Sequence, residues 1–77
     1  MSRVSATRFA AFLHQHGITC VRIAVRAGIS PGYGSDLKQG KSEPTLGIMV
    51  ALAGAASLLL RRKVRVTELF DLGDGER

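Results

Sequence analysis

Apolar positions along the chain recur at helical spacing, and glycine or polar residues separate the repeats. The first repeat predicts a helix from the N-cap candidate Ser5 to about His16, where Gly17 ends it. Its apolar face would consist of Ala6, Phe9, Ala10 and Leu13, with Phe12 widening the stripe.

Two short helices are expected next. Thr19 is suited to cap a helix from Cys20 to Ala27, and Gly28 would end it in the left-handed conformation. Ser30 is a second N-cap candidate, before a helix over Pro31–Gln39 that begins with proline at its first position. This third helix is glycine-rich and weak by propensity, so packing or a ligand must support it.

The C-terminal half predicts a long helix and a short one. Thr45 opens a segment that is apolar nearly all round through residues 46–60, as expected of a helix buried on more than one side. Thr67 is a candidate cap for a last helix over Glu68–Leu72. The chain is therefore expected to be all-α, with four to five short helices in a single domain over residues 1–77.

The composition limits the core. The 77 residues include no Trp, one Tyr and three Phe, so small aliphatic side chains must supply most of the buried surface. A domain of this size is marginally stable alone, and a second subunit is a natural source of further burial. The net charge of +5 suits a polyanion, although ordinary solubility charge explains it as well.

Several classes of site are not expected. The lone Cys20 allows no internal disulfide and no cysteine-based zinc site, and it is expected to be an inert small residue. His14 and His16 lie two apart and would face different sides of a helix, so surface histidines are expected rather than metal ligands. No catalytic arrangement or phosphate-cradling loop is present, and no enzyme activity, metal or cofactor is predicted. Without a signal core or a membrane-length apolar run, the chain is expected in the cytoplasm, associated with the nucleoid.

Residues 19–40 carry the functional prediction. Two short helices joined by a tight turn at Gly28 predict a helix-turn-helix. Ala24 would lie where the two helices approach closely, and Ile23, Ile29 and Leu37 would fix their angle. Such a unit projects its second helix outward, as insertion into a major groove requires.

These residues resemble the Cro/repressor-type (xenobiotic-response-element) helix-turn-helix family. The similarity lies in I-T-x-x-x-I-A-x-x-A-G-I-S, then L-K-Q-G-K, P-T-L and the closing V-T-E-L-F, over about residues 5–72. The resemblance implies a five-helix, lambda-repressor-like fold, double-stranded DNA binding and a homodimer on a palindromic operator.

The resemblance also implies a role for each position of the motif. Pro31–Gln39 would be the recognition helix, with bases approached by Pro31, Gly32, Ser35 and Asp36. Phosphates would lie near Thr19, Cys20, Ser30, Gln39, Lys41 and Ser42. Tyr33 and Lys38 would reach the DNA sideways. Asp36 would accept from a cytosine amino group or simply solvate the helix.

The chain departs from the family pattern in three places. Gly34 replaces a bulky apolar residue, and Cys20 replaces a glutamine-like one. Pro31 and Gly32 offer no side-chain hydrogen bonds where base readers normally stand, so backbone contacts, water and DNA shape should contribute more. Gly32 and Gly34 would mark close approach to the DNA backbone or a lack of selection for helix strength.

A further departure, outside the helix-turn-helix, is an insertion between Ala56 and Val66. The fourth helix is expected to be longer than usual, and the segment 57–72 is a candidate dimer interface in which Leu58–Leu60 meet a partner subunit or complete the core. The adjacent R-R-K-x-R cluster would solvate the helix end or make an accessory phosphate contact.

The function predicted from the sequence is a sequence-specific transcriptional regulator, a repressor that binds a palindromic operator as a homodimer. The alternative is an antitoxin or protein-interaction module that keeps the fold but binds a protein partner, such as a cognate toxin.

Overall fold

The computed structural model describes residues 6–70, and the side chains from residue 8 onward. The order of helices is α1 (Ala6–His16), α2 (Cys20–Ala27), α3 (Pro31–Gln39), α4 (Leu46–Leu60) and α5 (Val66–Leu69). Between residues 6 and 70 there is no β-strand. The all-α prediction with five short helices is therefore confirmed.

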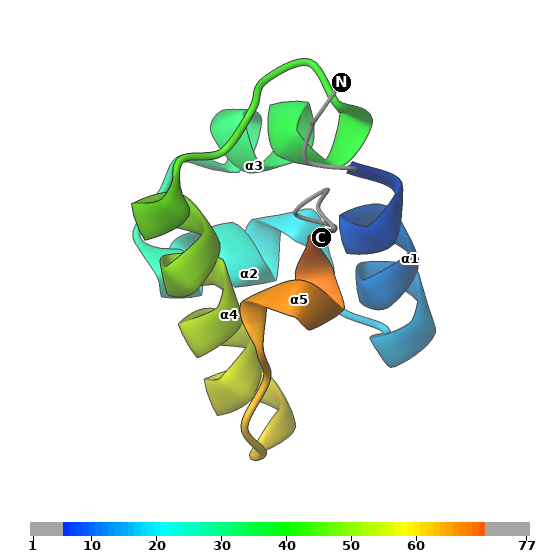
Figure 1. Ribbon diagram of the computed structural model, residues 1–77, viewed down its shortest axis with the longest axis vertical. Coiled ribbons are helices and arrows are strands. Elements are labelled where there is room, and N and C mark those ends of the chain that lie inside the picture. Colours follow the sequence, from blue (N-terminus) through cyan, green and yellow to red (C-terminus); the bar gives the residue numbers. More distant parts are fainter. Residues whose placement is uncertain (1–5, 71–77) are drawn as a thin grey trace, which may run out of the picture.

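The helices enclose one core, to which all five contribute. In Figure 1, α3 lies across one end of the molecule, and α4 begins at that end and runs along the long axis. Helix α1 packs on α3 and α5, α2 packs on α3 and α4, and α4 also packs on α5. The fully buried large side chains are Phe9, Leu13, Ile23, Leu37, Leu52, Leu69 and Phe70.

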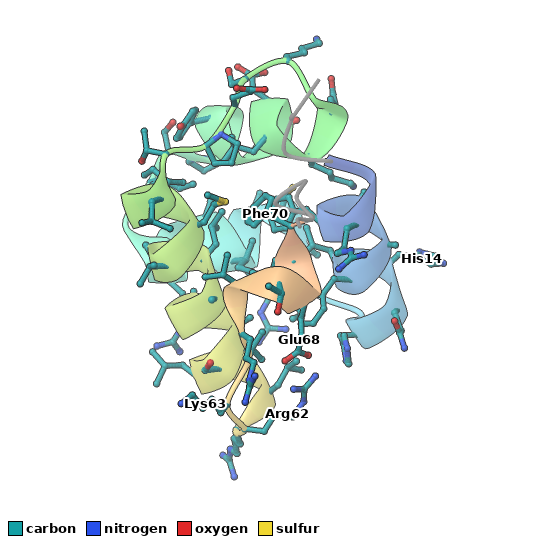
Figure 2. The ribbon with its side chains drawn as sticks, in the orientation of Figure 1. His14, Arg62, Lys63, Glu68 and Phe70 are labelled. Atoms are coloured by element: carbon teal, nitrogen blue, oxygen red, sulfur yellow. The ribbon has the colours of Figure 1, made fainter. Side chains whose placement is uncertain are left out.

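Aromatic residues connect the two ends of the described chain. The rings of Phe9 and Phe70 stack with their centroids 5.1 Å apart (Phe70 is labelled in Figure 2). Arg8 Nη1 donates a hydrogen bond to the carbonyl oxygen of Thr67 at 2.8 Å. Phe12 is also buried, so all three phenylalanines belong to the core.

The predicted helix ends agree closely with the structure for α2, α3 and α4. Thr19, Ser30 and Thr45 each accept a hydrogen bond from a backbone N–H in the first turn of the helix that follows, as N-cap residues do. The predicted cap at Ser5 lies outside the described residues.

Helix α5 differs from the prediction. It begins at Val66, two residues before the expected start, and Arg65 rather than Thr67 occupies the N-cap position. Glu68 Oε2 accepts the backbone N–H of Arg65 at 3.0 Å, which is the contact that the N3 residue makes in a capping box. The described part of α5 ends at Leu69, because Phe70 is already extended, and the predicted end at Leu72 lies outside the described residues.

The turn after α4 is held by Ser57. Its Oγ donates to the carbonyl oxygen of Ala53 at 2.8 Å and accepts the backbone N–H of Val64 at 2.9 Å. Of the three leucines that end α4, Leu59 and Leu60 pack partly against the core, whereas Leu58 is exposed. The core explanation therefore applies to the first two, and Leu58 is left facing outward.

Candidate nucleic-acid interface

A left-handed glycine makes the turn between α2 and α3. Gly28 has φ 79° and ψ 24°, a conformation that residues with a Cβ rarely adopt. Its N–H donates to the carbonyl oxygen of Val25 at 3.2 Å, and the N–H of Ile29 donates to that of Ala24 at 3.0 Å. These two bonds close the end of α2, and the chain turns within three residues into α3.

Helices α2 and α3 come closest at Ala24 and Gly34. Ala24 is fully buried, and a Cβ built on Gly34 would lie 3.1 Å from the Ala24 Cβ. Gly34 therefore faces α2, and its proposed role in approaching the DNA backbone is wrong. The bulky residue that the family places here would not fit at this helix spacing.

The predicted apolar wedge is present around this crossing. Ile23 and Leu37 are buried, and Ile29 packs partly against the same core. The predicted close approach at Ala24 is also confirmed, because a Cβ added to Gly34 would lie only 3.1 Å from the Ala24 Cβ. The angle of α3 is thus determined by contacts on its inner side.

The outer side of α3 is polar and small. Pro31, Gly32, Lys38 and Gln39 are exposed, and Ser35 and Asp36 are half-buried. Gln39 Nε2 donates to Ser35 Oγ at 3.2 Å, one turn apart on this side. A duplex approaching α3 would therefore meet hydroxyl, amide, carboxylate and ammonium groups, with little side-chain volume at the N-terminal turn.

Tyr33 belongs to both sides of α3. It is half-buried and packs against the core, and its backbone N–H donates to Ser30 Oγ at 3.2 Å. Part of the ring is thus occupied by protein contacts, while the remaining surface is accessible for the sideways contact predicted from the sequence.

The capping hydroxyls keep a free donor. Thr19 Oγ1 accepts the N–H of Arg22 at 3.1 Å, and Ser30 Oγ accepts that of Tyr33. Each hydroxyl still has its own hydrogen to donate, and both residues are exposed. Thr19 and Ser30 can therefore bind an anionic oxygen without giving up the cap.

Cys20 turns its side chain toward α3. Its Sγ donates a long hydrogen bond to the carbonyl oxygen of Gly34 at 3.7 Å, and the residue is half-buried. The thiol therefore supports the α2–α3 contact, in agreement with the expectation of a small packing residue. Its backbone N–H lies in the first turn of α2, where N–H groups lack partners within the helix.

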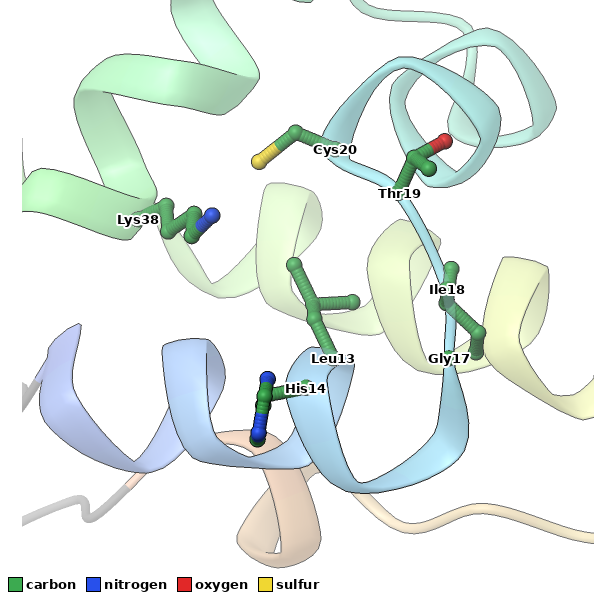
Figure 3. Close-up of a pocket in the computed structure, with 7 residues that line it drawn as sticks. All are labelled: Leu13, His14, Gly17, Ile18, Thr19, Cys20 and Lys38. Carbon is green, nitrogen blue, oxygen red and sulfur yellow. The ribbon is translucent and has the colours of Figure 1, made fainter.

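A notch opens beside this helix end. It has a volume of about 390 Å³ and joins α1, the start of α2 and α3 (Figure 3). The side chains of Lys38 and Cys20 extend toward each other across it in Figure 3. An ammonium group beside a helix N-terminus suits an anion such as a phosphate. The lining residues are Leu13, His14, Gly17, Ile18, Thr19, Cys20 and Lys38.

His14 lines this notch, although the sequence did not predict it as a DNA-contacting residue. It was expected to be a surface histidine, and it is indeed exposed. The signal was its position one turn before Gly17, which brings the end of α1 back toward α2. His16, in contrast, packs its ring on Phe12 with centroids 4.5 Å apart, so the two histidines do not share a site.

Lys41 and Ser42 follow the end of α3. Gly40 is left-handed, with φ 79°, and the N–H of Lys41 donates to the carbonyl oxygen of Asp36 at 2.8 Å. Lys41 is exposed and Ser42 is half-buried. Both residues thus lie in the loop that directly follows α3, and their contact with phosphates stays a prediction.

The R-R-K-x-R cluster lies elsewhere. Arg62 and Lys63 are at the end of the molecule opposite α3 (Figure 2). Arg62 Nη2 forms an ion pair with Glu68 Oε1 at 3.0 Å, while Lys63 and Arg65 are exposed. An accessory contact with the duplex that α3 approaches is not supported by this placement.

Two classes of site are missing from the described part of the chain. No group of three or more His, Cys, Asp or Glu is arranged to hold a metal ion between residues 6 and 70. None of the five helices is both long enough and apolar enough to cross a bilayer, within the same residues.

Comparisons with protein-family models, with curated proteins and with solved structures each found no match to the chain.

Proposed function

We propose that the chain is a sequence-specific DNA-binding transcriptional regulator of the helix-turn-helix type, with α3 inserted in the major groove. One observation carries this proposal. The inner side of α3 is held by Gly34 and Leu37, so that a capped helix presents Pro31, Gly32, Ser35, Asp36 and Gln39 on the outside, at one end of the molecule. A rigid, outward polar helix after a glycine turn suits a duplex groove.

The residues around α3 divide by chemistry. Thr19, Ser30 and Lys41 offer hydroxyl or ammonium donors to phosphates, and Cys20 offers its backbone N–H. Gln39 and Ser42 supply further polar groups, and Tyr33 and Lys38 contact the DNA from the side. Such contacts determine orientation and register but do not read bases.

Base reading falls to a small group. Ser35 and Asp36 are the polar side chains nearest the N-terminal half of α3, after Pro31 and Gly32. Asp36 is suited to accept from a cytosine amino group. We expect DNA shape and bridging water to supply much of the remaining specificity.

We further propose that the protein is a homodimeric cytoplasmic repressor on a palindromic operator. Two copies would place two α3 helices in successive major grooves, about 34 Å apart. The +5 charge of each chain would strengthen the non-specific part of binding through counterion release.

The direct test is a gel-shift assay with the DNA upstream of the protein's own gene, over a series of salt concentrations. A regulator keeps its preference for that DNA over an unrelated duplex as salt rises, although both affinities fall. If no duplex is bound even at low ionic strength, the proposal is wrong.

A pair of variants tests the orientation of α3. Lys41→Ala should weaken binding to all sequences alike and reduce the salt slope by roughly one unit. Asp36→Ala should change the preference at one base position. If both changes act equally on every sequence, the reading side has been assigned incorrectly.

A second candidate function is supported by a groove away from α3. Its walls are Val21, Val25 and Leu59, flanked by Arg22 and Arg26, and its volume is about 240 Å³. An apolar groove with two arginines suits an acidic protein segment, as an antitoxin or an interaction module would need. This function is favoured over DNA recognition if the protein binds no duplex but binds a protein ligand, and if Val25→Lys abolishes that protein binding.

A further inference from the structure

The outer side of α4 is apolar along its whole length. All 15 residues of the helix are uncharged, and Ser57 is its one polar side chain. Residues four apart line up on this side to form a ridge of Leu46, Val50, Gly54 and Leu58, which we call the α4 ridge. Leu46, Val50 and Leu58 are 66%, 55% and 68% exposed.

The packing of residues 8–70 against one another does not use this ridge. The opposite side of α4 supplies Met49, Leu52, Ala53, Ala55 and Ala56 to the core. In Figure 1, α4 forms one edge of the molecule, with no other described helix outside it. A Cβ built on Gly54 would meet nothing within 4 Å, so the space over the centre of the ridge is open.

We propose that the α4 ridge is the surface on which a second copy of this chain docks, α4 against α4. The first reason is charge. Exposed cations lie on several other elements, with Arg22 and Arg26 on α2, Lys38 and Lys41 at α3, and a basic cluster at residues 61–65, whereas α4 carries none. Two chains of net charge +5 repel each other most weakly where neither presents a charged residue.

The second reason is the shape of the ridge. Val50 and Leu58 stand one turn to either side of Gly54, which has no side chain. Ridges with this spacing pack at a crossing angle of about −50°, and a glycine at the crossing point lets the two backbones approach closely. In a parallel pair, a twofold axis at Gly54 would then bring each side chain of the ridge against its own copy, so that the same surface serves both partners.

The direction of packing rests on the proposed DNA-binding function. Since α3 lies at the end where α4 begins, parallel α4 helices place both α3 helices at the same end of the dimer (Figure 1). Antiparallel helices would place them at opposite ends, out of reach of one duplex. The inference is therefore a parallel α4 pair.

The affinity is expected to be modest. Three large side chains and one glycine cover less than the roughly 800 Å² per partner of a standard interface. A micromolar dimer is expected for the free protein, and operator DNA that holds two copies side by side would favour it further.

The first experiment is sedimentation equilibrium of the full chain, without DNA, over a micromolar concentration series. Val50→Lys should raise the dimer Kd at least roughly tenfold, because it sets two like charges against each other across the axis. Val25→Lys is the matched control, since Val25 is 64% exposed on α2 and the charge change is identical. The control should dimerise as the wild type does, and circular dichroism should show both variants folded.

Three outcomes would overturn the interface: a wild type that stays monomeric throughout the series, a Val50→Lys variant that still dimerises, or a dimer abolished by Val25→Lys. The last would locate the contact on the α2 groove. Because no DNA is present, these results do not depend on operator binding. If the protein is a monomer that binds its operator, only the proposed α4 interface is wrong. If it is a dimer that binds no duplex, only the proposed DNA-binding function is wrong.

The second experiment tests direction by disulfide cross-linking, in a Cys20→Ser background that removes the native thiol. In a parallel pair, Val50→Cys alone should form a cross-linked dimer on oxidation. An antiparallel pair that crosses at Gly54 would bring position 50 near position 58 of the other copy. Cross-linking only in a mixture of Val50→Cys and Leu58→Cys chains would therefore overturn the parallel arrangement.

Discussion

Helices α3 and α4 are maintained in opposite ways. Helix α3 contains Gly32 and Gly34, which weaken it by roughly 1 kcal/mol each for interior positions, and its ends are closed by Ser30 and Gly40. Helix α4 also has a capped start and two glycines, but nine of its 15 residues are Leu or Ala, which favour helix. The weak helix is therefore fixed by its contacts, whereas the strong helix has apolar surface left over. A weak helix held on its inner side can keep a polar outer side, and surplus apolar surface favours association.

The largest test compares a leucine from each helix. Leu37 in α3 is 1% exposed, so Leu37→Ala should lower the free energy of unfolding by about 2–5 kcal/mol, through lost burial and a cavity. Leu46 in α4 is mostly exposed, and Leu46→Ala should change the free energy of unfolding of the monomer by no more than about 0.5 kcal/mol. Urea unfolding followed by circular dichroism, at concentrations below dimerisation, measures both. Equal losses would contradict the description of α4 as the helix with unused surface.

The next test compares two glycines of α3. Gly34→Val should cost about 1–3 kcal/mol, because its Cβ would lie 3.1 Å from that of Ala24 and force α2 and α3 apart. Gly32 has nothing within 4 Å of its Cβ position, so Gly32→Ala should stabilise the fold, by at most about 1 kcal/mol. Thermal unfolding of the two variants gives the sign directly. A stabilising Gly34→Val would show that the close approach of the two helices does not determine the position of α3.

A smaller effect is expected at the ends of α2 and α4. A left-handed residue follows each of these two helices. It is Gly28 after α2 and Arg61, with φ 57°, after α4. Gly28→Ala should cost about 1 kcal/mol, since left-handed backbone strains a residue with a Cβ. Arg61→Gly should relieve that strain and stabilise by up to about 1 kcal/mol, less the entropy gained by the unfolded chain. If Arg61→Gly were as destabilising as Gly28→Ala, contacts of the Arg61 side chain would have to outweigh the backbone strain.

The sequence predicted the local features of the helix-turn-helix well. The caps at Thr19 and Ser30, the turn at Gly28 and the close approach at Ala24 all follow from short-range backbone and steric rules, and each is present. Those rules involve residues within a few positions of each other, so a single sequence contains them.

Part of what the sequence did not predict depends on distance in the chain. The inward role of Gly34 requires knowing which side of α3 meets α2. The start of α5 was missed for a local reason, because Arg65 carries no capping hydroxyl and only Glu68, three residues on, bonds its backbone N–H. The apolar runs of α4 did not distinguish the buried Leu52 from the exposed Leu58, because periodicity disappears in a helix that is apolar all round.

The smallest test uses pH, because backbone hydrogen bonds hold the turn after α3 whereas a carboxylate takes part at the start of α5. Backbone hydrogen bonds close the turn after α3, and they do not titrate in the acid range. Near α5, hydrogen bonding to Arg62, and then to the backbone N–H of Arg65, lowers the pKa of Glu68. As the pH falls, Glu68 is therefore protonated in the unfolded chain before it is protonated in the folded chain. The stabilisation by the ionised carboxylate is complete above the ordinary pKa of about 4.3 and is lost as the pH falls through the lower folded value.

The variant Glu68→Gln keeps an oxygen that can accept from Arg65 but cannot titrate, so its unfolding midpoint should fall less than that of the wild type between neutral pH and pH ~3. The effect should be small and weaker in high salt, because the pair is exposed. Parallel curves for the two proteins would mean that the carboxylate adds nothing that the amide does not, and that the start of α5 is determined by the burial of Leu69 and Phe70 instead.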